Sequence, residues 1–407
     1  MRVARAVQSG IGQQSLFLYG PNNIFVRKLA SNAALNSDQS SAMKLANQLS
    51  YANPNYSYNG GTAPSFYGYS GMGYGGLSLG LATLVIFQYY TIPLYVVDST
   101  VPNQTVTYIQ SNGSPEAPGA ATNLQSYFNA VPVPDVTKIP QGQIQADGTD
   151  GHAVFWRPST NELWEMWKFS GSPGAYTFRY GGYTSSADTF DGVYPNYWGA
   201  RATGMASAGG LITIQDIVDV LHGLPIQHAI MVAPPVTSAT SFSAPVVPVP
   251  PATRNDSASN TAQYEADGVT PNPAYGSVDA VGEGTWCRFP ASFNPATAMP
   301  SSGPIALAIA TAIRDYGLFV GDTAGGAIFC LEDARVLGSP YSWAKVNPFA
   351  RHNSSVGNYY DSYINDNVPS TWTDPTLPKV TEVMGGTNGV VSQIPWQQLQ
   401  VLQPFSA

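Results

Sequence analysis

The segment from Asp147 to Phe169, DGTDGHAVFWRPSTNELWEMWKF, constrains the fold of this chain more than any other. Its two flanks are apolar, aromatic and β-branched, whereas Arg157 to Glu162 contains the Pro, Ser, Thr and Asn residues that favour turns. Two such runs around a short polar loop are typical of paired antiparallel strands. The segment therefore predicts a β-hairpin.

The predicted hairpin also gathers side chains that could bind a sugar. If Trp156 lies opposite Leu163, the register is set for the whole hairpin, and opposed residues share a face. The same register gives the pairs Val154 with Glu165, His152 with Trp167, and Asp150 with Phe169. Asp150, His152, Glu165 and Trp167 would then lie together. A shift of one residue would move Glu165 to the other face and dissolve this group.

Two kinds of sugar chemistry fit the group. In a binding site, tryptophan rings stack on sugar rings while polar side chains bond the hydroxyls. The glycan-binding candidates are Asp150, His152, Trp156, Glu165, Trp167 and His228, the last of which opens a later apolar strand. In a glycoside hydrolase, two carboxylates flank the bond at roughly 5 to 9.5 Å from each other, and Asp150 and Glu165 are the weak catalytic candidates.

A structural interpretation of the same residues stays open. The tryptophans could belong to the core, and Glu165 could be a solvated partner of Arg157 or Lys168. His228 could likewise serve only the packing of its strand. The hairpin therefore predicts either a site or a pair of core strands.

The chain is poor in charge. Asp, Glu, Lys and Arg make up 10% of its 407 residues, whereas an ordinary globular protein has roughly 25%. The surface must therefore consist of uncharged polar residues, and 24 Tyr, 16 Phe and 8 Trp supply a core as well as contact area. Such a surface suits an extracellular protein that touches carbohydrate. The net charge of −8 argues against nucleic acid, which requires a concentrated basic surface.

The cysteines and histidines predict no metal site. Cys287 and Cys330 each lie in an apolar run, and neighbouring strands could bring them within bridging distance; two buried free thiols are the alternative. The four histidines show no short ligand spacing, and the chain has no GxGxxG, P-loop, GxSxG or HExxH motif. We therefore expect neither a metal nor a cofactor.

The chain is expected to form one β-rich domain, residues 23–407, behind an N-terminal extension, residues 1–22. The Gly/Tyr-rich residues 51–76 and the Pro-rich residues 234–276 indicate loop insertions. The first residues lack the apolar run of a signal peptide. The most apolar segment, residues 77–97, is interrupted by Gly, Gln and Pro, so it is expected to form strands rather than a membrane helix.

Strand patterns outnumber helix patterns. Strands outside the hairpin are expected at 81–88, 90–98, 104–110 and 176–183. The expected helices are one capped by Ser37 and running to Leu49, one after Thr122, one between Thr213 and Leu221, and one from Pro304 that ends at Gly317. Thr213 and Asp216 fit a capping box, and His222 would interact with the dipole of that helix. The fold class is mainly β: an antiparallel, jelly-roll-like sandwich with a few peripheral short helices.

Several segments together resemble a known family. Besides the hairpin they are AVPVPD at 130–135, WGARATGMASAGGLITIQDI at 198–217, IQHAIMVA, GTWCRFPASF and AIRDYGLFVGD. Their order and spacing, over about residues 24–402, resemble a family of secreted actinobacterial proteins of unassigned activity. That family has relatives among the minor tail proteins of actinobacteriophages. The resemblance implies no catalytic residues.

The resemblance and the missing export signal lead us to expect a virion protein that leaves its host by lysis. It would be a minor tail or tail-tip component that contacts the host envelope through a glycan-binding face. Expected partners are other tail subunits, with residues 1–22 as an anchor, further copies of the chain, and a host cell-wall glycan, but neither nucleic acid nor membrane. A glycan-cleaving enzyme and a purely structural virion or decoration protein stay open as alternatives.

Overall fold

The computed structural model describes residues 18–50, 84–85, 92–109, 120–134, 150–195, 198–234, 237, 248–254, 281–323, 328–332 and 393–404. The predictions about the tract 51–76 and about most of 234–276 lie outside these residues, as do residues 1–17 of the expected extension. Among the described residues, no helix is long and apolar enough to span a membrane.

Strands predominate over helices. The helices are α1 (Ser40–Ser50), α2 (Ala120–Tyr127), α3 (Ile214–Leu221), α5 (Pro295–Ala298), α6 (Pro304–Asp315) and the 3-10 turn η8 (Trp396–Gln398). The strands are β1 (Leu84–Val85), β2 (Leu94–Val96), β3 (Asn103–Gln104), β4 (Val106–Tyr108), β5 (Val131–Pro132), β6 (Ala153–Arg157), β7 (Glu162–Trp167), β8 (Tyr176–Phe178), β9 (Tyr180–Thr184), β10 (Ile230–Ala233), β11 (Trp286–Arg288), β12 (Leu318–Val320), β13 (Ile328–Phe329) and β14 (Gln400–Val401). The mainly β class is thus confirmed.

The sheets are mixed rather than antiparallel. The larger sheet has the order β1-β13-β10-β12-β11-β14, and in it β1 runs parallel to β13 and β10 parallel to β12. The smaller sheet, β2-β6-β7-β9, joins β2 to β6 in parallel, and β4 pairs with β8 in parallel as a separate ribbon. The prediction of a purely antiparallel sandwich is wrong in this respect. Long connections, such as the one from β10 to β12 through α6, permit parallel neighbours that short hairpins do not.

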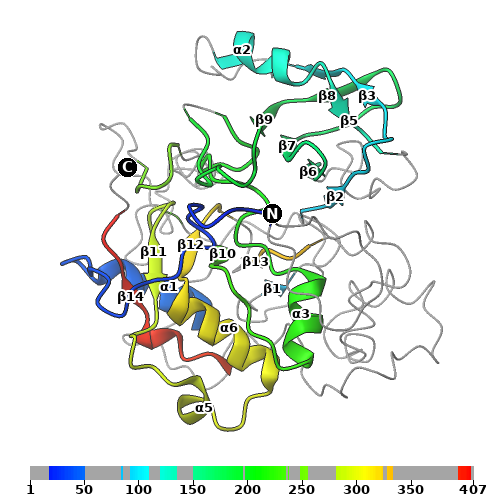
Figure 1. Ribbon diagram of the computed structural model, residues 1–407. Coiled ribbons are helices and arrows are strands. Elements are labelled where there is room, and N and C mark those ends of the chain that lie inside the picture. The colour runs from blue at the N-terminus through cyan, green and yellow to red at the C-terminus, as the bar shows by residue number, and fades with distance from the viewer. Residues whose placement is uncertain are drawn as a thin grey trace, which may run out of the picture.

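The two sheets share a buried layer. One face of the larger sheet, with Val232, packs on α1, α3 and α6. The opposite face, with Met231, meets Trp156 on the smaller sheet. The far face of the smaller sheet, with Phe155, packs against Phe128 beside α2. Figure 1 shows this succession from α2 at the top, through the two sheets, to the helices below. Both faces of each sheet are therefore covered.

The hairpin forms in the predicted register. Trp156 lies opposite Leu163, and Val154 lies opposite Glu165. The paired ladder ends at Ala153 and Met166, however, so the expected pairs of His152 with Trp167 and Asp150 with Phe169 do not form. Instead the Lys168 amide donates to the Asp150 carbonyl at 2.9 Å, and the Phe169 amide donates to the Gly151 carbonyl at 2.8 Å. Gly151 and Lys168 have positive φ angles of 62° and 55°, which bend both strands at this end.

Several helix predictions hold with shifted starts. In α1 the apolar stripe Ala42, Leu45, Ala46 and Leu49 is buried. The helix begins at Ser40 rather than after Ser37, because the Asp38 carboxylate accepts the Ser40 amide at 2.8 Å. Helix α2 begins at Ala120, before Thr122. Helices α3 and α6 occupy their predicted ranges, and Gly317 after α6 has a left-handed φ of 104°.

Two strand predictions need correction. The run 176–183 is not one strand, because the chain changes sheets at Arg179: β8 pairs with β4, and β9 pairs with β7. Cys287 and Cys330 are not on neighbouring strands, since Cys287 belongs to β11 and Cys330 follows β13, with β10 and β12 between them. Cys287 faces the helices and Cys330 faces the layer between the sheets. Both are buried free thiols, which is the alternative left open above.

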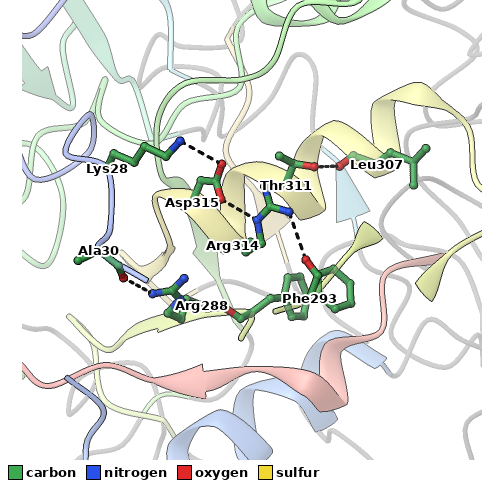
Figure 2. Close-up of polar contacts among 9 residues, drawn as sticks. Lys28, Ala30, Arg288, Phe293, Leu307, Thr311, Arg314 and Asp315 are labelled. Atoms are coloured by element: carbon green, nitrogen blue, oxygen red, sulfur yellow. Dashed lines mark hydrogen bonds and ion pairs between the residues drawn. The ribbon is translucent and has the colours of Figure 1, made fainter. Parts of the chain in front are cut away.

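Part of the expected N-terminal extension belongs to the core. Leu18 and Tyr19 are buried in the layer between the sheets, so the folded part of the chain includes residues that lie before the predicted boundary at 23. The following segment is fastened to α6 (Figure 2): Lys28 pairs with Asp315 at 3.6 Å, and the Arg288 guanidinium of β11 donates to the Ala30 carbonyl at 2.8 Å. These contacts fix the path of the chain into α1.

Candidate functional site

Glu165 of β7 forms the centre of a polar cluster between the two sheets. Its carboxylate is completely buried. The amides of Ser207 and Ala208 donate to its two oxygens at 2.8 and 3.0 Å, and the Tyr19 hydroxyl donates at 3.4 Å. Burial raises the pKa of Glu165, while the two amides, Arg201 and Tyr19 lower it in part. The carboxylate therefore joins the hairpin to two distant segments of the chain.

Glycines of β9 make room for this cluster. Gly182 lies opposite Glu165 in the sheet. A Cβ atom at Gly182 would overlap the ring of Tyr194, so only glycine lets this ring lie across the strand. Tyr194 is itself buried, and burial together with Glu165 and Tyr19 raises the pKa of its phenol well above the ordinary value. Tyr194 is therefore neutral and packs beside the acid.

Arg201 is the buried cation of the cluster. Its guanidinium donates to the Ser207 carbonyl at 3.2 Å, and the residue is 3% exposed. Burial alone would lower the pKa of Arg201, but Cys330, Asp322 and Glu165 raise it, so the net shift is upward. A permanent positive charge thus lies close to Glu165 in a region that water does not reach.

His152 is held neutral by burial and by the same cation. The residue is 5% exposed, and burial, Arg201 and Lys168 lower its pKa to about 3. The Nδ1 atom of His152 is buried and has no hydrogen-bond partner among the described residues. His152 therefore lies within the field of both Arg201 and Lys168, beneath the outer end of the hairpin.

A row of partly exposed aromatic and charged side chains lies at the open end of the hairpin, opposite its turn. We call this row the rim strip; it consists of Asp150, Trp167, Lys168, Tyr180 and Arg254. Trp167 lies opposite Tyr180 across β7 and β9, with ring centroids 5.5 Å apart. The Lys168 ammonium lies 4.7 Å from the Trp167 ring, and the Arg254 guanidinium lies 5.0 Å from the Tyr180 ring. Asp150 is 3.7 Å from the Lys168 ammonium.

The six predicted glycan-binding residues therefore divide into three groups. Asp150 and Trp167 lie on the partly exposed rim strip. His152 and Glu165 lie behind it in the buried cluster. The two others belong to neither the rim strip nor the buried cluster. Trp156 is in the core, and its indole donates to Asn161. His228 pairs with Asp216 of α3 at 3.1 Å.

The buried cluster contains functional candidates that the sequence reasoning did not single out. Tyr19, Tyr194, Arg201 and Ser207 come from segments far from the hairpin. A signal for one of them existed, since Arg201 stands alone in the run GARATGMASAGG, where a charged residue among small ones predicts a buried ion pair. On the strip, Tyr180 and Arg254 were missed for lack of any local pattern.

The arrangement suits binding at the strip better than acid catalysis within the cluster. Glu165 is enclosed and accepts three hydrogen bonds, whereas the Asp150 side chain is 38% exposed. A glycosidase needs both carboxylates against one bond of the substrate. Within the described residues, no group of three or more His, Cys, Asp or Glu side chains is placed to hold a metal ion.

Comparison of the chain with protein-family models, with curated proteins and with solved structures gives no match. The rim strip and the cluster are therefore interpreted from their own geometry.

Proposed function

We propose that the protein is a structural component of a bacteriophage virion, a minor tail or tail-tip protein that contacts the envelope of an actinobacterial host. The proposal rests on the sequence resemblance of the hairpin and of residues 198–217, and on a low-charge, aromatic composition. Its partners would be other tail subunits, further copies of the chain and a host cell-wall glycan. The protein would reside in the tail and reach the medium when the host lyses.

The rim strip is the observation that carries the binding part of this proposal. Trp167 and Tyr180 are adjacent, partly exposed rings on rigid neighbouring strands. Rings of this kind offer contact area at low entropic cost, and a nearby carboxylate such as Asp150 can accept hydrogen bonds from sugar hydroxyls. Glu165 and His152 then support the strip from behind rather than touch the ligand.

A binding assay on host cell walls tests this assignment. Replacing Trp167 with Ala should reduce co-sedimentation with purified actinobacterial cell-wall polysaccharide by about tenfold or more, because stacking on an aromatic ring is lost. Trp156→Phe is the matched control, since it changes a tryptophan of the same hairpin that is buried in the core. Retained binding by a folded Trp167→Ala protein would contradict the proposal and favour a purely structural virion protein.

A glycan-cleaving enzyme is the second candidate, because the hairpin and its open end carry two carboxylates, the partly exposed Asp150 and the buried Glu165. A substitution of Asp150, the more exposed of the two acids, distinguishes a glycan-binding protein from a hydrolase. Asp150→Asn should lower the affinity for glycan modestly in a binder, whereas in a hydrolase it should abolish the release of reducing ends while the substrate is still bound.

A further inference from the structure

We propose that the rim strip recognises an anionic glycan, one that carries carboxylate or phosphate groups. This inference rests on the proposed glycan-binding function and adds the chemical class of the ligand. Its basis is a continuous row of contacts in the order Lys168, Trp167, Tyr180 and Arg254, in which a cation lies at each end of a tilted aromatic pair.

The two cations are held in place by the fold. Arg254 donates to the carbonyl oxygens of Gly199 and Arg201, so its guanidinium cannot swing away from the Tyr180 ring. Lys168 has a left-handed backbone, with φ at 55°, and its ammonium lies between Asp150 and the Trp167 ring. A non-glycine residue in this conformation is uncommon and is often found at functional sites.

Charge distribution separates the strip from the rest of the chain. The whole protein has 17 Lys and Arg against 25 Asp and Glu, for a net charge of −8. On the strip itself the balance is reversed, since Lys168 and Arg254 stand against Asp150, while the buried Arg201 behind it is offset by Glu165 and Asp322. An anionic polymer would be repelled by most of the molecule and attracted here.

The depressed basicity of His152 agrees with this field. Arg201 and Lys168 both act against its protonation, in addition to burial. A neutral sugar would gain nothing from such a field. A carboxylate or phosphate placed over the aromatic pair would instead gain charge-assisted hydrogen bonds from Lys168, with Arg254 adding attraction.

Binding measurements with three defined polymers test the inference: polygalacturonic acid for carboxylate, glycerol-phosphate teichoic acid for phosphate, and dextran as the neutral probe. We expect the full-length protein to bind one or both anionic polymers and not dextran. Affinity should fall about tenfold or more between 0.05 and 0.5 M NaCl, since salt screens such contacts. The carboxylate and phosphate arms identify which group is recognised.

Variants assign the effect to the strip. Lys168→Gln should weaken binding of the anionic polymer about tenfold, Lys168→Arg should restore it, and Lys44→Gln on α1 is the control that should change nothing. The protein could instead bind dextran or a neutral host polysaccharide, in a way that requires Trp167 and does not depend on salt. That result would contradict the anionic class of the ligand but would leave the glycan-binding function standing. Failure to bind any of these polymers or the host wall would overturn both.

Discussion

Two histidines, the buried His152 and the largely buried His228, lie in opposite electrostatic surroundings. His152, behind the rim strip, has Arg201 and Lys168 nearby, and its pKa falls to about 3. His228, beside α3, is held by Asp216 at 3.1 Å, and its pKa rises above the ordinary value although burial opposes this. Burial is the largest influence on both. The charge of the neighbour decides whether the histidine is neutral or protonated.

The buried acids of the two regions, Asp216 and Glu165, also have pKa shifts of opposite direction. Burial raises the pKa of Asp216, but His228 and Thr213 reverse this, and the net shift is downward. Glu165 has one buried cation and three neutral donors, and its net shift is upward. Asp216 and His228 thus form a compact ion pair at a helix end. Glu165 belongs to a wider network in which backbone amides share the task of stabilising the charge.

The largest expected effect is the loss of that wider network. Glu165→Ala should lower the free energy of unfolding by ~3 to 5 kcal/mol, because it leaves the Ser207 and Ala208 amides buried without their acceptor and removes the negative charge that partly balances the buried Arg201. Urea denaturation of both proteins would measure it. Glu162→Ala is the matched control: the same residue type, on the same strand, is partly exposed, and its loss should cost below about 1 kcal/mol. Equal losses at the two positions would show that the Glu165 cluster has no special role.

The histidines should give pH dependences of opposite sign. The folded-state pKa of His152 is lowered from 6.5 to about 3, so the unfolded chain binds the extra proton first, and stability should fall as pH decreases from about 6.5 towards 3. The ceiling of this loss is about 5 kcal/mol. His228 has a raised folded-state pKa, so its contribution is present below about 6.5 and is lost as pH rises through the folded value.

Single substitutions separate the two contributions. The stability of the parent protein minus that of His152→Gln should change with pH only on the acid side of pH 6.5, where it should fall as pH decreases. The corresponding difference for His228→Gln should be present at pH 6.5 and below and should decrease as pH rises above 6.5. Thermal unfolding across a series of buffers measures both. Slopes of the same sign in the two differences would contradict the assignment of the neighbouring charges.

Features formed by residues close together in the sequence could be predicted from it, whereas contacts between residues far apart in the sequence could not. The hairpin register follows from a polar loop of fixed length between strands, and the Thr213 capping box follows from a four-residue pattern. Tyr19 is 146 residues away from Glu165, and no periodicity encodes their contact. The parallel neighbours β10 and β12 are likewise joined only through a long connection. Their pairing is set by how the helices cover the sheet.

The same distinction explains the candidate site. Asp150 and Trp167 were found because they are close in sequence and belong to one hairpin. The prediction also placed Glu165 and His152 at a surface, because a hairpin considered alone has two open faces. In the folded chain the larger sheet covers one of those faces, so these two side chains are buried. Exposure is a tertiary property, and the sequence of the hairpin does not contain it.

The smallest expected effect concerns the capping box that holds Asp216. The Thr213 hydroxyl donates to the Asp216 carboxylate at 2.6 Å and accepts the Asp216 amide at 3.0 Å, so Thr213→Val should cost about 1 kcal/mol. Thr311→Val on α6 is the control, since that hydroxyl only donates to the Leu307 carbonyl at 2.7 Å (Figure 2), and its loss should stay within about 0.5 kcal/mol. Because Thr213 also helps to keep Asp216 ionised, Thr213→Val should reduce the stabilisation by protonated His228 that is lost as pH rises above about 6.5. If the pH dependence due to His228 does not change, the pair of Asp216 and His228 does not depend on the Thr213 hydroxyl. The opposite pKa shifts of Asp216 and Glu165 would then come from their charged neighbours alone and not from their hydrogen-bond donors.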